Sequence, residues 1–132
     1  MAFIEWDPSY SVGVHLIDDQ HKQLFGFINA FHDDKENLKH TLEDLLSYVD
    51  FHFKTEEEYF KNFGYENQEE HRAQHKFYEE EIKDLYKKYL LEKQSEGRIS
   101  KEMQEFIKDW ITRHIKISDK QYQECFNKHG LV

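Results

Sequence analysis

Residues 42–60, LEDLLSYVDFHFKTEEEYF, carry the pattern that decides the fold. Six positions in this stretch recur every three or four residues, as positions on one face of an α-helix do. They are Leu42, Leu45, Val49, His52, Glu56 and Phe60. Because an imidazole and a carboxylate take the place of apolar residues on a face that should be buried, the pattern predicts a core helix with a polar site inside the core.

The same kind of face recurs in three other segments, and each carries its own histidine. The inner positions are Ile17, His21, Leu24, Ile28 and Phe31 in a helix that Asp18 should cap; His71, His75, Tyr78, Ile82, Leu85 and Tyr89 after Asn67; and Met103, Phe106, Ile107, Trp110, His114 and Ile117 in a helix that Ser100 should cap. The central helix should run over about 38–63 and end at Gly64 in a left-handed cap.

Four helices with short polar connections at 33–37 and 92–97 predict an all-α fold, an up-down-up-down antiparallel four-helix bundle. Residues 1–16 contain Pro8 and Gly13 and lack helical spacing, so they should form an extended arm. Residues 118–128 should form a short terminal helix. We expect the whole chain, 1–132, to be a single domain.

Composition narrows the class of protein. With 18 basic and 27 acidic residues the net charge is −9, which disfavours binding to nucleic acid or to an anionic membrane. A single cysteine, Cys125, cannot form an internal disulfide. No signal peptide is readable in residues 1–7, and no apolar run approaches the ~20 residues of a membrane span. We therefore expect a cytoplasmic monomer.

The spacing of the polar core residues predicts how they meet. His52 and Glu56, like His71 and His75, are four residues apart and share a helix face. In contrast, the five residues from His114 to Asp119 would separate these side chains by about 140° in a regular helix. We therefore expect a break at 116–118 that turns Asp119 toward the other six residues.

Seven candidate ligands are more than one metal ion normally takes. They are His21, His52, Glu56, His71, His75, His114 and Asp119. If Glu56 and Asp119 bridge two ions, one ion has three histidines and the other has two, which leaves an open coordination position. This nitrogen-rich, thiolate-free set suits iron, manganese, zinc or copper. The other histidines, His15, His32, His40 and His129, should lie on the surface.

Five segments together resemble the hemerythrin family, in particular its single-domain bacteriohemerythrins. They are WDPSYSVGV at 6–14, IDDQH at 17–21, HFKTEE at 52–57, HRAQH at 71–75 and HIKISDKQY at 114–122. The resemblance implies a non-haem di-iron centre with an oxo or hydroxo bridge. His71, His75 and His114 would hold the six-coordinate iron, His21 and His52 the five-coordinate iron, and Glu56 and Asp119 would bridge the two.

Three further positions are interpreted through this resemblance. Ile111 matches an apolar residue over the family's oxygen pocket and should form a wall of that pocket. Tyr122 matches a family tyrosine that could support the bridge, although a packing role fits it equally well. Phe60 stands where methionine is common, and we expect it not to touch a ligand.

The implied function is reversible dioxygen binding for storage, buffering or delivery, by a protein that is not an enzyme. One alternative is a di-iron oxidase, peroxidase or nitric oxide reductase. Ferritin-like di-iron sites use Glu-x-x-His motifs, and no histidine in this chain has a glutamate three residues before it, which disfavours that alternative. A second alternative is an oxygen or redox sensor that acts through a separate, unidentified partner.

Overall fold

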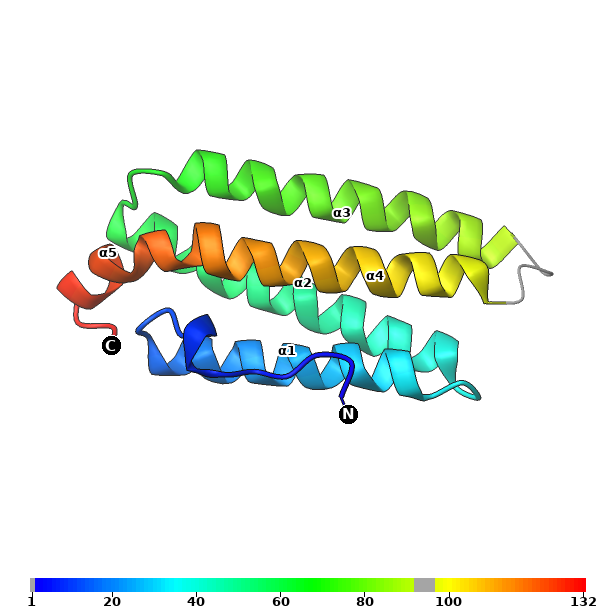
Figure 1. The fold of residues 1–132 in the computed structure, drawn as a ribbon. Helices are drawn as coiled ribbons and strands as arrows, with labels where there is room; N and C mark the ends of the chain where they lie inside the picture. Colours follow the sequence, from blue (N-terminus) through cyan, green and yellow to red (C-terminus); the bar gives the residue numbers. More distant parts are fainter. Residues whose placement is uncertain (1, 92–96) are drawn as a thin grey trace.

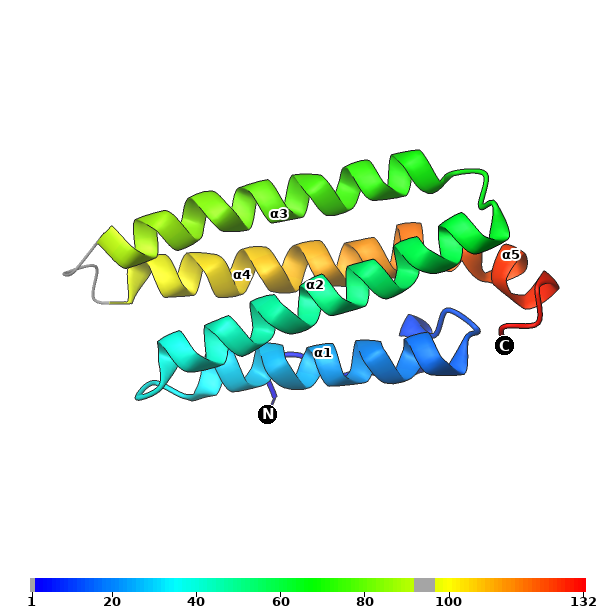
Figure 2. The ribbon, with the colours of Figure 1, turned by 180° about the vertical axis from the view of Figure 1, so that it is seen from behind.

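The computed structural model describes residues 2–91 and 97–132 and shows four long helices in a bundle (Figures 1 and 2). They are α1 (His15–Asp33), α2 (Leu38–Phe63), α3 (Gln68–Leu91) and α4 (Arg98–Arg113). Consecutive helices run in opposite directions, and α1 also packs against α4, which closes the bundle. The predicted up-down-up-down architecture is confirmed. Of the predicted connection at 92–97, residues 92–96 lie outside the described part of the chain.

The core follows the apolar stripes of the four helices. Fully buried side chains include Ile17, Leu24, Ile28, Leu42, Leu45, Met103 and Ile107. Toward the end where α2 meets α3, the core becomes aromatic, with Phe53, Phe60, Tyr122 and Phe126 all buried. Gly64 ends α2 with a φ of 61°, the left-handed conformation that glycine adopts without a Cβ clash.

The N-terminal arm is shorter than predicted, because α1 begins at His15 and not after Asp18. Asp18 does not cap the helix. Its carboxylate accepts a hydrogen bond of 2.6 Å from the Ser11 hydroxyl and one of 2.8 Å from the Val12 backbone N–H. Asp18 thus fastens the arm to α1, while Val12 and Val14 are buried in the core.

Helix α4 also begins earlier than predicted. Gly97, at a φ of 84°, occupies the N-cap position, so the predicted role of Ser100 as the cap was wrong. The Ser100 hydroxyl lies within the first turn and donates instead to the Gly97 carbonyl, at 2.9 Å. The backbone of a left-handed glycine therefore starts this helix, where the sequence pattern indicated a serine side chain.

The helix does not break between His114 and Asp119. It continues as a π-helical turn, His114–Ser118, then a 3-10 turn, Asp119–Tyr122, and then α5 (Gln123–Lys128). The Asp119 N–H donates to the carbonyl of His114, five residues earlier. Because the turn holds an extra residue, Ile117 is 64% exposed, and the prediction that it lies in the core was wrong.

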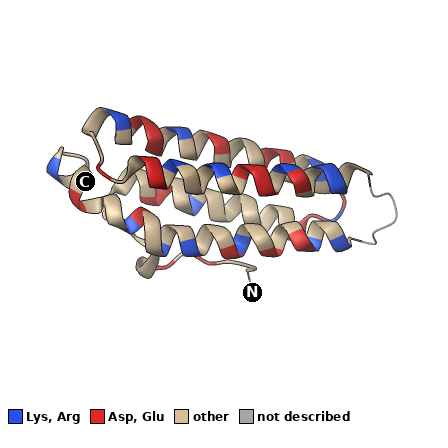
Figure 3. Cartoon of the chain, turned by 90° about the horizontal axis from the view of Figure 1, so that it is seen from above, with Lys and Arg blue, Asp and Glu red and all other residues tan. Residues whose placement is uncertain are grey.

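The outside of the bundle is strongly charged. In the view of Figure 3, acidic and basic residues are interspersed along the helices. Among residues 2–91 and 97–132, no helix is both long and apolar enough to cross a membrane.

Candidate metal centre

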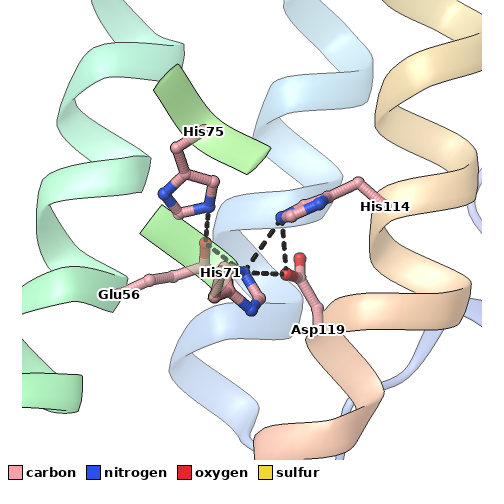
Figure 4. Close-up of side chains that lie close together, drawn as sticks. All are labelled: Glu56, His71, His75, His114 and Asp119. Atoms are coloured by element: carbon pink, nitrogen blue, oxygen red, sulfur yellow. Dashed lines mark hydrogen bonds and ion pairs between the residues drawn. The ribbon is translucent and has the colours of Figure 1, made fainter. Parts of the chain in front are cut away.

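The seven polar core residues meet in one buried region between the helices, nearer the aromatic end of the bundle. Their ligand-type atoms form two overlapping groups, each with all atoms within 4.8 Å of one another. One group is Glu56, His71, His75, His114 and Asp119, and the other is His21, His52, Glu56 and Asp119. Figure 4 shows the larger group pointing inward from α2, α3 and the two turns that follow α4. Glu56 and Asp119 belong to both groups, so they lie between them.

The π-helical turn brings Asp119 into this region. Because the turn holds an extra residue, Asp119 lies on the same side of the helix as His114. Asp119 Oδ1 is 3.0 Å from His114 Nε2. The same oxygen is 2.9 Å from His71 Nε2, while Oδ2 is 3.1 Å from His21 Nε2. One carboxylate thus turns an oxygen toward each group.

Glu56 faces the two groups from α2, whereas Asp119 faces them from the turn that follows α4. Its Oε1 lies 3.2 Å from His75 Nε2 and 3.7 Å from His52 Nε2. Its Oε2 accepts a hydrogen bond of 2.6 Å from the buried hydroxyl of Tyr122. Tyr122 therefore holds the carboxylate in an orientation that leaves Oε1 between the histidines.

The cluster has a strong internal electrostatic field. Burial and the Asp119 charge would raise the pKa of Glu56, but His52, His75 and His71 outweigh them and lower it to about 2. Burial opposes ionisation of Asp119 as well, yet neighbouring histidines hold its pKa well below the usual value. Burial lowers the pKa of His52 to about 4. Two charged carboxylates thus lie among closely spaced imidazoles.

Several atoms of the cluster lack the partners that buried polar atoms normally have. In the described part of the chain, Glu56 Oε1, His75 Nε2 and both oxygens of Asp119 are buried without a hydrogen bond. The Nε2 atoms of His21 and His52 face each other at 3.0 Å, and those of His71 and His114 do the same. Such convergent acceptors are costly unless a cation binds them. The donor set therefore fits metal ions that prefer nitrogen and oxygen.

Comparison with known protein families identifies the family in which this cluster occurs. The sequence model described as "Hemerythrin HHE cation binding domain" matches residues 12–126. The chain belongs to the hemerythrin family. Family membership and the buried histidine–carboxylate cluster together support non-haem iron binding.

Hemerythrin relatives match nearly the full chain. The bacteriohemerythrin of Methylococcus capsulatus is 31% identical over 133 residues, covering 96% of this chain and 99% of the relative. A hemerythrin-like protein of Naegleria gruberi is 35% identical and covers 89% of both. A crystal structure of wild-type hemerythrin is 31% identical with a TM-score of 0.84, covering 94% of this chain and 98% of that one.

Two residues that contact the cluster histidines of this hemerythrin-family chain were not predicted from the sequence. Gln20 Oε1 lies 2.7 Å from His52 Nδ1, and Glu57 Oε2 lies 2.8 Å from His75 Nδ1. Gln20 and Glu57 are adjacent in sequence to His21 and Glu56, so they fall about 100° away from the inner stripes. Periodicity alone therefore does not place them at the cluster.

Aromatic rings hold the histidines from the sides. Phe53 stacks on His75 with ring centroids 3.8 Å apart, and Trp110 stacks on His114 at 4.4 Å. Phe60 meets the His71 ring edge-on at 4.7 Å, so the expectation that Phe60 touches no candidate ligand was wrong. The departure from methionine at this position therefore changes the surroundings of the cluster itself.

Most of the remaining predicted positions lie where the sequence placed them, but His32 is less exposed than predicted. Ile111 is buried in α4, one turn before His114, and its role as a pocket wall stays a prediction. His15, His40 and His129 are exposed as predicted. His32 is half-buried and stacks on Phe3 in the arm, with ring centroids 4.1 Å apart.

Replacing Tyr122 with phenylalanine should lower the free energy of unfolding of the metal-free protein by about 1–3 kcal/mol, because Glu56 Oε2 loses its buried donor. Urea denaturation followed by circular dichroism measures this change. The matched control is Tyr59→Phe, at a half-buried tyrosine of α2 whose ring, like that of Tyr122, packs against Phe126. Equal stability of the two variants would mean that the Tyr122 hydroxyl contributes nothing to the cluster.

Proposed function

We propose that this protein binds two iron ions in the buried cluster and binds dioxygen reversibly at them, for storage, buffering or delivery. The observation that carries this proposal is the pair of overlapping donor groups that share Glu56 and Asp119. Bound ferrous iron would supply both the site for dioxygen and the electrons for its reversible reduction. His21, His52, His71, His75 and His114 would be the nitrogen ligands, and the two carboxylates would bridge the ions.

The two donor groups suit different tasks. The larger group offers three imidazoles besides the shared carboxylates, whereas the smaller group offers only His21 and His52. An ion in the smaller group has fewer protein ligands and therefore more room for a small molecule. We place dioxygen binding on the side of His21 and His52 for this reason.

The residues around the cluster favour release of dioxygen over its further reaction, because they supply few protons. Burial raises the pKa of Tyr122 well above its usual value, with the Glu56 charge adding to the effect. The hydroxyl therefore keeps its proton and donates a hydrogen bond to Glu56 Oε2. Buried apolar side chains such as Phe53 and Ile111 help to keep bulk water out.

Oxygen cycling tests this proposal directly. Protein loaded anaerobically with ferrous iron should develop a visible charge-transfer band in air, lose the band under argon and regain it over several cycles. Zinc-loaded protein is the control and should show no band, because zinc has no redox chemistry. If the first exposure to oxygen leaves permanently ferric protein, reversible carriage is wrong and the enzymatic alternative gains support.

A further inference from the structure

The two donor groups differ in the hydrogen bonds that reach them from outside. His75, in the larger group, has the Glu57 carboxylate 2.8 Å from its Nδ1. His52, in the smaller group, has the neutral amide oxygen of Gln20 2.7 Å from its Nδ1. Both partners are acceptors, so each imidazole donates its Nδ1–H outward and turns Nε2 toward the cluster.

The charge of the group that accepts the Nδ1 hydrogen bond affects how strongly an imidazole binds a cation through Nε2. A hydrogen bond to a carboxylate is stronger than one to a neutral amide and donates more electron density to the ring. His75 is also held from several sides. It lies between Glu56 and Glu57 and stacks on Phe53 with the two ring planes 2° apart. Little ordering is left for a metal ion to impose on it.

The smaller group lacks these advantages. Its other histidine, His21, has a buried Nδ1 that no described residue reaches with a hydrogen bond. Within residues 2–91 and 97–132, neither His21 nor His52 therefore has an anionic acceptor at Nδ1. The larger group combines one more imidazole with one more negative charge, and both differences favour the binding of a divalent cation there.

We propose that the two metal positions fill in a fixed order, with the first ion in the group of His71, His75 and His114. Glu57 is the positioning residue that gives this group its higher affinity through His75. This inference rests on the two-ion site proposed above and adds an order of loading and a residue that sets it. The ion that accepts dioxygen is then the second to bind and the first to be lost.

Titration of the metal-free full chain with cobalt(II) alone tests the order. We expect two resolved binding steps by isothermal titration calorimetry, with dissociation constants that differ by about 10–100-fold. Glu57→Gln keeps the shape and an acceptor but removes the charge, and it should weaken the first step by about 10–100-fold while the second step changes little. The control is Glu58→Gln, the same substitution at an exposed residue one position later.

A reciprocal variant moves a charge to the other group. Gln20→Glu should tighten the second step and narrow the gap between the two dissociation constants. NMR at one equivalent of cobalt(II) adds a readout of position, since the strongly shifted imidazole signals should come from His71, His75 and His114. Circular dichroism verifies that each variant folds, and Glu57 is half-buried, so its replacement leaves the core packing intact.

The outcomes separate this inference from the proposed function. If the wild-type protein binds two cobalt ions with equal affinity, or if Glu57→Gln behaves like Glu58→Gln, the order of loading is wrong while the two-ion site stands. Shifted signals from His21 and His52 at one equivalent would also overturn it. If the wild-type protein binds fewer than two ions, the proposed two-ion site itself is wrong.

Discussion

Replacing Glu56 with alanine should reduce the iron content of the protein from the proposed two ions per chain to one at most. Glu56 belongs to both donor groups, and its Oε1 lies 3.2 Å from His75 Nε2 and 3.7 Å from His52 Nε2. Without this carboxylate each group loses a ligand, and the pair of ions loses a negative charge that offsets their mutual repulsion. Metal analysis of anaerobically reconstituted protein measures the effect.

Two further variants make the Glu56 result specific. Glu56→Gln keeps the side-chain shape and an oxygen that can accept from Tyr122, so a loss of metal in this variant reports on charge and not on folding. Glu58→Ala removes a glutamate from the exposed face of α2 and should leave two ions bound. Retention of both ions in Glu56→Ala would show that its bridging role is misassigned.

Removal of the bound metal should also have a large effect and lower the unfolding temperature of the protein by about 10–15 °C. The folded chain gathers five imidazoles and two carboxylates that the unfolded chain does not hold together. A ligand that binds only the folded state adds about 4 kcal/mol at a free concentration 1,000 times its dissociation constant. For a domain of this size, each kcal/mol corresponds to a few degrees of unfolding temperature.

Thermal unfolding followed by circular dichroism, before and after chelation, measures this difference. The unfolding temperature of the loaded protein should rise with the concentration of free metal, since the stabilisation follows mass action. The Glu56→Ala variant serves as the control and should show a smaller shift. An unfolding temperature that does not respond to chelation would argue against a metal-binding core.

The fold was predictable where one helix face alone determines the structure. The stripe from Leu42 to Phe60 placed α2 at Leu38–Phe63, with Gly64 as the left-handed cap, and the structure confirms these bounds. The convergence of the seven polar residues was also predictable, because buried imidazoles and carboxylates on four inner faces must meet in the core. Their role as iron ligands stays a proposal.

Backbone geometry was less predictable than side-chain pattern. Asp18 and Ser100 have the chemistry of helix caps, but both lie inside helices and bind backbone or side-chain groups of the preceding residues. The five-residue gap before Asp119 correctly indicated an irregular helix. It could not distinguish a break from a π-helical turn, since both bring Asp119 back to the inner side.

The residues that face Nδ1 of His52 and His75 could not be predicted from periodicity. Gln20 and Glu57 lie on helix positions next to the inner stripes, where a polar residue is expected to face water. Only the three-dimensional arrangement shows that Gln20 crosses from α1 to His52 on α2, and that Glu57 crosses from α2 to His75 on α3.

The π-helical turn makes the metal centre sensitive to chain length as well as to residue type. Most of the bundle surface can accept substitutions without moving Asp119, because the side chains there point away from the core. Insertion of one residue at 115–117 would leave every candidate ligand in the sequence, yet it would rotate Asp119 by about 100° relative to His114, because each helical residue turns the chain by that amount. The same insertion would turn the residues of α5 out of register with the groups they pack against. In this segment, the number of residues from His114 to Asp119 has to match the winding of the turn that joins them.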